Sequence, residues 1–73
     1  MSHKLITVRS SNGYQQYKWY PSGALFGADK RFMSWSTWRV GSARTLSDAI
    51  EIAKSDFGGS RQTTYVEELD GDA

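Results

Sequence analysis

The sequence contains no cysteine, one proline and one histidine among its 73 residues. The absence of cysteine excludes disulfide bonds and thiolate metal ligands, and it is typical of proteins in a reducing cytoplasm. No apolar run approaches the roughly 20 residues that a membrane-spanning helix needs, and the first residues lack the apolar stretch of a secretory signal. We therefore expect a cytoplasmic protein with no membrane partner.

Groups that perform catalysis are scarce as well. The histidine, His3, lies so close to the N-terminus that we expect a solvated side chain on a frayed tail. No serine stands in a Gly-x-Ser-x-Gly motif, and Gly23 and Gly27 are not followed by the Lys-Ser/Thr of a phosphate loop. The acidic residues lack calcium-loop spacing. The sequence thus predicts a protein without enzymatic activity, without a cofactor and without a metal site.

The chain has room for a single domain, residues 1–73, in which residues 1–3 and 70–73 are expected to be frayed tails. Its charges are divided unevenly along the sequence. Residues 1–44 hold seven Lys or Arg and one acid, whereas residues 45–73 hold two Lys or Arg and seven acids. This division predicts either a basic surface built by the first half and an acidic surface built by the second, or merely the differently charged outer faces of a sheet and a helix.

The segment from Lys4 to Tyr20 has the pattern of a β-hairpin. Asn12-Gly13 is the dipeptide that two-residue type I′ turns prefer, because both central positions need a positive φ. With these two residues as the loop, one face of the hairpin is apolar and the other is polar. The predicted pairs are Ile6 with Trp19 and Val8 with Tyr17 on the apolar face, and Thr7 with Lys18 and Arg9 with Gln16 on the polar face.

Two more strands and one helix are predicted beyond the hairpin. Residues 22–31 contain two glycines and no clear period, so we expect a loop with Leu25 and Phe26 against the edge of the core. Aromatic and β-branched residues predict a strand over residues 32–40, and alternation predicts a last strand over residues 62–69. Together with a helix over residues 45–57, the order of elements is β-β-β-α-β. This order predicts an α+β fold, in which one antiparallel sheet is covered on one face by one α-helix.

Residues 45–57 have the period of an amphipathic helix. Thr45 is a suitable N-cap, and Gly58-Gly59 supplies the C-terminal stop. One apolar stripe runs along the helix through Leu46, Ala49, Ile50, Ala53 and Phe57. We expect this stripe to pack on the hairpin, with Tyr17, Trp19 and Phe57 as the aromatic residues of the core.

Alternation in the strand over residues 32–40 places Trp35 and Arg39 on one face, and Trp38 and Val40 on the other. We expect Trp38 and Val40 to lie in the core beneath the helix, although a β-bulge between residues 34 and 37 would exchange Trp35 and Trp38. The other sheet face then carries the candidate partner-binding residues, which are Arg9, Lys18, Tyr20, Trp35 and Arg39.

Aromatic rings among Arg and Lys side chains have several interpretations. They can stack nucleic-acid bases and neutralise phosphates, and the same residue types are enriched at the hot spots of protein–protein interfaces. Alternatively, Trp35 packs under the loop of Leu25 and Phe26, and the rest of the face is solvated. The face can also pair with itself in a homodimer. The sequence leaves these interpretations open.

Two segments resemble known proteins. Gly41-Ser-Ala-Arg-Thr-Leu-Ser-Asp-Ala-Ile-Glu-Ile-Ala-Lys54, continued by Gly58-Gly59 and Tyr65-Val66-Glu67-Glu68, resembles the helix-and-strand half of small phage-encoded proteins, among them anti-CRISPR proteins. Over residues 41–69 this resemblance implies a compact inhibitor that occupies a site on a larger protein or ribonucleoprotein complex in a bacterial cytoplasm. Trp35-Ser-Thr-Trp38-Arg39-Val40-Gly41 is similar to the Trp-Gly-Arg-Val-Gly signature of a DNA-contacting domain.

The sequence therefore favours a non-catalytic binding protein of phage or prophage type, which inhibits a bacterial defence (CRISPR-type) or regulatory complex by protein–protein contact. The alternative is a nucleic-acid-binding module that uses the aromatic and basic sheet face. A third hypothesis is an acidic mimic of DNA, with its carboxylates at Glu67, Glu68, Asp70 and Asp72.

Overall fold

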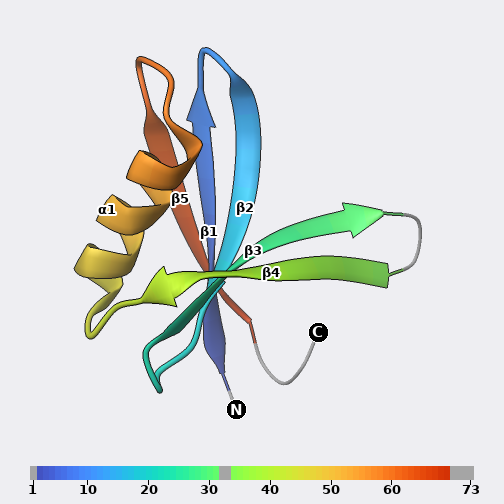
Figure 1. Cartoon of the computed structure of the whole chain (residues 1–73), viewed down its shortest axis with the longest axis vertical. Coiled ribbons are helices and arrows are strands. Elements are labelled where there is room, and N and C mark those ends of the chain that lie inside the picture. The colour runs from blue at the N-terminus through green and yellow to red at the C-terminus, as the bar shows by residue number, and fades with distance from the viewer. Residues whose placement is uncertain (1, 32–33, 70–73) are drawn as a thin grey trace.

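One sheet and one helix make up the part of the chain that the structure describes (Figure 1). This computed structural model describes residues 2–31 and 34–69. The elements are β1 (His3–Ser10), β2 (Gly13–Trp19), β3 (Ala24–Arg31), β4 (Ser34–Ser42), α1 (Leu46–Phe57) and β5 (Thr63–Leu69). All neighbouring strands are antiparallel, in the order β4-β3-β2-β1-β5. The predicted α+β class, with one antiparallel sheet covered on one face by one helix, is confirmed.

The segment predicted as a loop, residues 22–31, is mostly a strand, so that prediction was wrong. Gly23 has a φ of 108°, and its N–H donates to the carbonyl of Tyr20 at 2.8 Å, which turns the chain back at once. β3 then pairs with β2, and Leu25 is fully buried. The element order is consequently β-β-β-β-α-β, with one strand more than predicted.

The strand predicted over residues 32–40 corresponds to β4. Residues 32 and 33 lie outside the described residues, as do residues 70–73, for which a frayed acidic tail was predicted. A β-bulge interrupts the β3–β4 ladder, because Leu25 pairs with Gly41 whereas Phe26 pairs with Arg39. Since this bulge follows Arg39, it does not exchange the faces of Trp35 and Trp38.

The β1–β2 hairpin forms, but its register differs from the predicted one by two residues. Ser10 pairs with Gly13, so the loop is Ser11 and Asn12, and only Gly13 of the predicted loop has a positive φ (109°). A hydrogen bond of 3.0 Å from the N–H of Ser11 to the carbonyl of Ser60 holds this loop against the segment before β5. Because a shift of two residues keeps every side chain on its face, the predicted apolar and polar faces are retained.

The corrected register gives the hairpin new cross-strand pairs. In place of the predicted partners, Ile6 pairs with Tyr17, Val8 with Gln15, Thr7 with Gln16 and Arg9 with Tyr14. The pairing of Arg9 with Tyr14 brings a guanidinium beside an aromatic ring, which the predicted register did not do.

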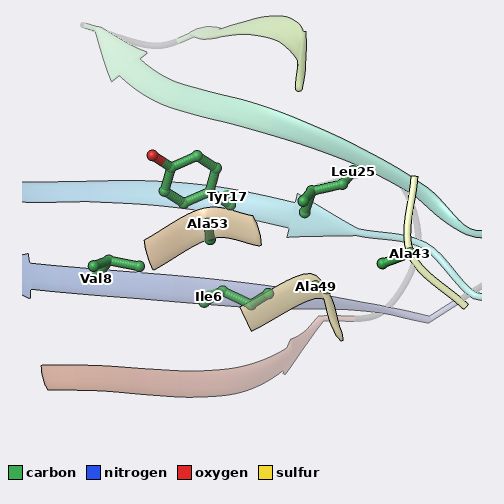
Figure 2. Close-up of a cluster of buried hydrophobic side chains, with 7 residues drawn as sticks. All are labelled: Ile6, Val8, Tyr17, Leu25, Ala43, Ala49 and Ala53. Atoms are coloured by element: carbon green, nitrogen blue, oxygen red, sulfur yellow. The ribbon is translucent and has the colours of Figure 1, made fainter. Parts of the chain in front are cut away.

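α1 begins and ends where the sequence predicts. The side-chain oxygen of Thr45 accepts a hydrogen bond of 3.2 Å from the N–H of Asp48, as an N-cap does. Gly58 follows the helix with a φ of 75°, and its N–H donates to the carbonyl of Lys54 at 2.9 Å. Ala49 and Ala53 are fully buried, and their small side chains let the helix lie close to β1 and β2 (Figure 2).

The core lies between α1 and one face of the sheet (Figure 2). Its buried apolar residues are Ile6, Val8, Tyr17, Leu25, Ala43, Ala49 and Ala53. Two polar atoms at this core are hydrogen-bonded: the Tyr17 hydroxyl donates to Asp56 at 2.9 Å, and Nε1 of Trp19 donates to the carbonyl of Ala43 at 3.0 Å. Of the expected aromatic core residues, Tyr17 is fully buried, whereas Trp19 and Phe57 pack against the cluster and remain half-buried.

Trp38 lies on the helix side of the sheet, as expected, but it is not a core residue. Its side chain covers Gly27 on the neighbouring strand and is 42% exposed. The prediction that Trp38 is buried was therefore wrong, because α1 does not enclose this part of β4. Val40, the other expected residue, is partly buried against the core.

Candidate interaction surface

The sheet face opposite α1 carries no helix from the described residues. Directly paired residues of antiparallel strands share a face, so the register assigns each side chain to one of the two faces. Ile6, Val8 and Tyr17 lie under the helix, and the residues that alternate with them lie on the other side, called here the uncovered face. Its members include Tyr20, which follows β2, and, from the strands, His3, Leu5, Thr7, Arg9, Tyr14, Gln16, Lys18, Phe26, Ala28, Trp35, Thr37, Arg39, Thr63, Tyr65, Glu67 and Leu69.

The five residues predicted from the sequence lie on this face, but Arg9 is at the opposite end from the other four, and the five differ in exposure. Arg9 and Arg39 are exposed, and Tyr20 and Trp35 are half-buried. Lys18 is only 4% exposed, with its Nζ 4.2 Å from the centroid of the Trp35 ring. The Trp35 ring therefore covers the ammonium group of Lys18, and Lys18 presents no charge to solvent.

Tyr20 belongs to a row of rings, here called the ring cluster, which consists of His3, Tyr20 and Phe26. The rings of His3 and Tyr20 are stacked with centroids 4.7 Å apart, and Phe26 meets Tyr20 edge-on at 5.8 Å. The guanidinium carbon of Arg39 lies 5.9 Å from the centroid of the Phe26 ring. This part of the face is a small packed layer with one exposed cation at its border.

His3 corrects the prediction of a frayed N-terminal tail. It is the first residue of β1 and is 1% exposed, so its side chain is buried and not solvated. Its strand pairs with both β2 and β5, and its ring lies against Tyr20. Of the predicted tail 1–3, Ser2 is exposed and residue 1 lies outside the described residues.

A shallow hollow opens at the other end of the face, and we call it the tyrosine hollow. Its lining is Thr7, Arg9, Tyr14 and Tyr65, and its volume is about 410 Å³. Tyr14 and Tyr65 are 63% and 55% exposed, respectively, more than any other large hydrophobic side chain that the structure describes. The guanidinium carbon of Arg9 lies 5.9 Å from the Tyr14 ring centroid, and Arg9 forms no ion pair with a described carboxylate.

The sequence interpretation missed the two tyrosines of this hollow. Tyr14 alternates with Gln16 and Lys18 along the strand, so that residue could have been found from the sequence. Tyr65 could not, because its position depends on the pairing of β5 with β1, which sets Tyr65 opposite Thr7. Nothing in the local sequence specifies which strand β5 joins.

Neither a metal centre nor a membrane segment is present in the described part of the chain. No three His, Asp or Glu side chains of residues 2–31 and 34–69 gather closely enough to hold a metal ion. The one helix of this region is too short and too polar to cross a membrane. Comparison with protein-family models, curated proteins and solved structures finds no match to this chain.

Proposed function

We propose that this chain is a non-catalytic binding protein that attaches to a larger bacterial protein or ribonucleoprotein complex through the tyrosine hollow. The observation that carries the proposal is the position of Arg9 between two exposed tyrosines, with no carboxylate partner among the described residues. Tyr and Arg are among the residues that contribute most binding energy at protein interfaces. A large exposed aromatic ring gains the most when a partner removes it from water.

The exposure of the cations favours a protein partner over a nucleic acid. A nucleic-acid groove follows the backbone with several accessible cations, each of which displaces a counterion. Among the described side chains of the uncovered face, only Arg9 and Arg39 are exposed cations, since Lys18 is covered by Trp35. Two separated cations are enough to align one or two carboxylates of a protein surface.

The resemblance of residues 41–69 to small phage-encoded inhibitors guides the choice of the first partners to test. We propose a role in the bacterial cytoplasm, where binding occupies a working surface of a defence or regulatory complex and thereby inhibits it. Under this proposal the helix and β5 supply the framework, and the tyrosine hollow supplies the contact.

Affinity capture from a bacterial lysate, quantified with variants of the face, tests this proposal. We expect a stoichiometric partner whose recovery falls at least about tenfold with Tyr14→Ala or Arg9→Ala, because hot-spot residues contribute about 2 kcal/mol or more. Arg44→Ala is the matched control, since Arg44 is also exposed but lies in the loop before α1. Equal recovery of the partner with Arg9→Ala and Arg44→Ala would show that the hollow is not the binding site.

A second candidate function, nucleic-acid binding, is favoured by an exposed cation beside an aromatic ring on the uncovered face. Arg39 is exposed, and its guanidinium carbon lies 5.9 Å from the centroid of the Phe26 ring. Fluorescence anisotropy with labelled single-stranded and double-stranded DNA and RNA, at low and moderate salt, tests this function. Arg39→Ala should reduce the slope of log affinity against log salt by about 1 if Arg39 contacts a phosphate. An affinity that does not depend on salt would exclude this candidate.

A further inference from the structure

The outer edge of β5 is open and regular. β5 is the last strand of the sheet, so one side of its backbone has no partner strand among residues 2–31 and 34–69. Its seven residues pair with β1 without interruption, and they include neither proline nor lysine. The opposite edge strand, β4, is interrupted by the bulge at Val40. Bulges, prolines and charged side chains, lysine above all, are the usual features that prevent a sheet edge from pairing with another chain. β5 has no bulge, proline or lysine, and its charged residues are Glu67 and Glu68.

Both faces of β5 also expose apolar surface next to this edge. Tyr65 is 55% exposed on the uncovered face, and Val66 is 43% exposed on the helix side. Val66 is exposed because α1 packs over β1, β2 and β4, with β5 at the side (Figure 2). A strand added to this edge would cover apolar groups on both faces.

Arg9 and Glu67 are charges of opposite sign on the uncovered face, and they lie on either side of Tyr65, two residues away along the direction of β5. Arg9 lies beside Thr63, its direct partner on β5, and Glu67 is on β5 itself. Thr63 is two residues before Tyr65, and Glu67 is two residues after it. Neither Arg9 nor Glu67 forms an ion pair with a described residue, whereas Glu68 is already paired with Lys4, which lowers the pKa of the Glu68 carboxyl.

We propose that two copies of this chain associate through antiparallel pairing of their β5 edges, with Tyr65 at the two-fold axis. In this register Thr63 lies opposite Glu67 of the second copy, so the Glu67 carboxylate points across the small Thr63 side chain toward Arg9. Two strand spacings, about 10 Å between backbones, separate these two residues, a span that an arginine and a glutamate side chain bridge together. The symmetry repeats the ion pair, and the two Tyr65 rings meet at the axis.

The helix side of the same pairing is complementary as well. Val66 lies opposite Thr64 of the second copy, and the repeat of this contact covers the exposed part of both valines. Glu68 lies opposite Gln62 rather than opposite another carboxylate. The proposal does not depend on the proposed function, but it has a consequence for it: Arg9 and Tyr65, which line the tyrosine hollow, contact the second copy, so a larger partner that binds the hollow competes with the dimer, whereas Tyr14 contributes to the hollow alone.

Sedimentation equilibrium of the full chain over a range of concentrations tests the association. We expect a reversible dimer whose dissociation constant rises at least about tenfold with Glu67→Arg, because each of the two ion pairs becomes a repulsion. Arg9→Glu should have the same effect, and the double variant with both substitutions should restore dissociation to within about threefold of the original. Both residues are exposed, and circular dichroism checks that each variant is folded.

Glu51→Arg is the matched control for the change of charge, since Glu51 is exposed on the helix and paired with Lys54 at 3.6 Å. It should leave dimer formation unchanged. A second variant, Tyr65→Lys, places two ammonium groups at the axis and should abolish the dimer. A chain that remains monomeric at all concentrations would overturn the proposal, whether or not another protein adds a strand to β5. A dimer that forms equally well with Glu67→Arg would overturn it too.

Discussion

Gly27 and Trp38 are paired across β3 and β4, and the indole ring covers the glycine backbone. A methyl group at residue 27 would lie 2.2 Å from Cε2 and 2.4 Å from Nε1 of Trp38, which is far inside contact distance. Gly27 has no positive φ, so alanine is not strained by the backbone at this position. The substitution Gly27→Ala therefore perturbs one thing, the packing of the Trp38 ring.

The expected magnitude follows from the area that the ring covers. Trp38 is 42% exposed, so somewhat more than half of its surface is buried. A large aromatic side chain buries up to about 250 Å², and half of that at about 25 cal/mol per Å² corresponds to ~3 kcal/mol. A displaced ring keeps some contacts, and alanine is favoured over glycine in a strand by about 0.5–1 kcal/mol. We therefore expect Gly27→Ala to lower the free energy of unfolding by about 1–2 kcal/mol.

Urea unfolding followed by circular dichroism measures this loss, and a double-mutant cycle with Trp38→Ala identifies its cause. In the Trp38→Ala background no ring opposes the new methyl group, so Gly27→Ala should be neutral or slightly stabilising. The same loss of stability in both backgrounds would refute the reasoning. It would mean that Gly27 is required by the backbone or by a neighbour other than Trp38.

Three further substitutions, measured by urea unfolding, test the helix caps and the core. Thr45→Ala removes the acceptor of the Asp48 N–H and should cost about 1 kcal/mol. Gly58→Ala places a side chain at a φ of 75° and should cost about 1 kcal/mol, whereas a neutral result would argue against that cap geometry. Burial, aided by the bond to Asp56, raises the pKa of Tyr17, so stability should fall as the pH rises above the unfolded value of about 10; Tyr17→Phe should flatten this alkaline loss.

The helix could be predicted from the sequence because its determinants are local. The N-cap, the apolar stripe and the glycine stop all lie within residues 45–59, and each needs only the sequence on either side to act. The hairpin was predicted less completely. Its faces followed from alternation, but its register is influenced by Ser60, which is distant in the sequence and binds the backbone of Ser11.

β3 could not be recognised because its sequence lacks the residues that strands prefer. Gly27 suggests a loop in the sequence, but it lies inside β3. The residue has no side chain there because Trp38 occupies the space that a side chain would need. Ala28 is 1% exposed although alanine is a weak strand former. At Gly27 a side chain is excluded by Trp38 of the neighbouring strand, and that reason is visible only after the strands are paired.

The uncovered face consists of a packed region and an open region, and the two regions differ in which side chains a partner can reach. In the packed region, Trp35 covers Lys18 and the ring cluster buries His3, so these side chains already contact neighbouring rings and are removed from solvent. In the open region, the tyrosine hollow and the β5 edge leave Arg9, Tyr65 and Glu67 at the surface with the contacts of a partner still to be made. Binding energy comes from groups that are not yet satisfied. A partner that engages this face therefore gains more at the β1–β5 side than at Lys18 or Trp35, and substitutions there should separate binding from folding.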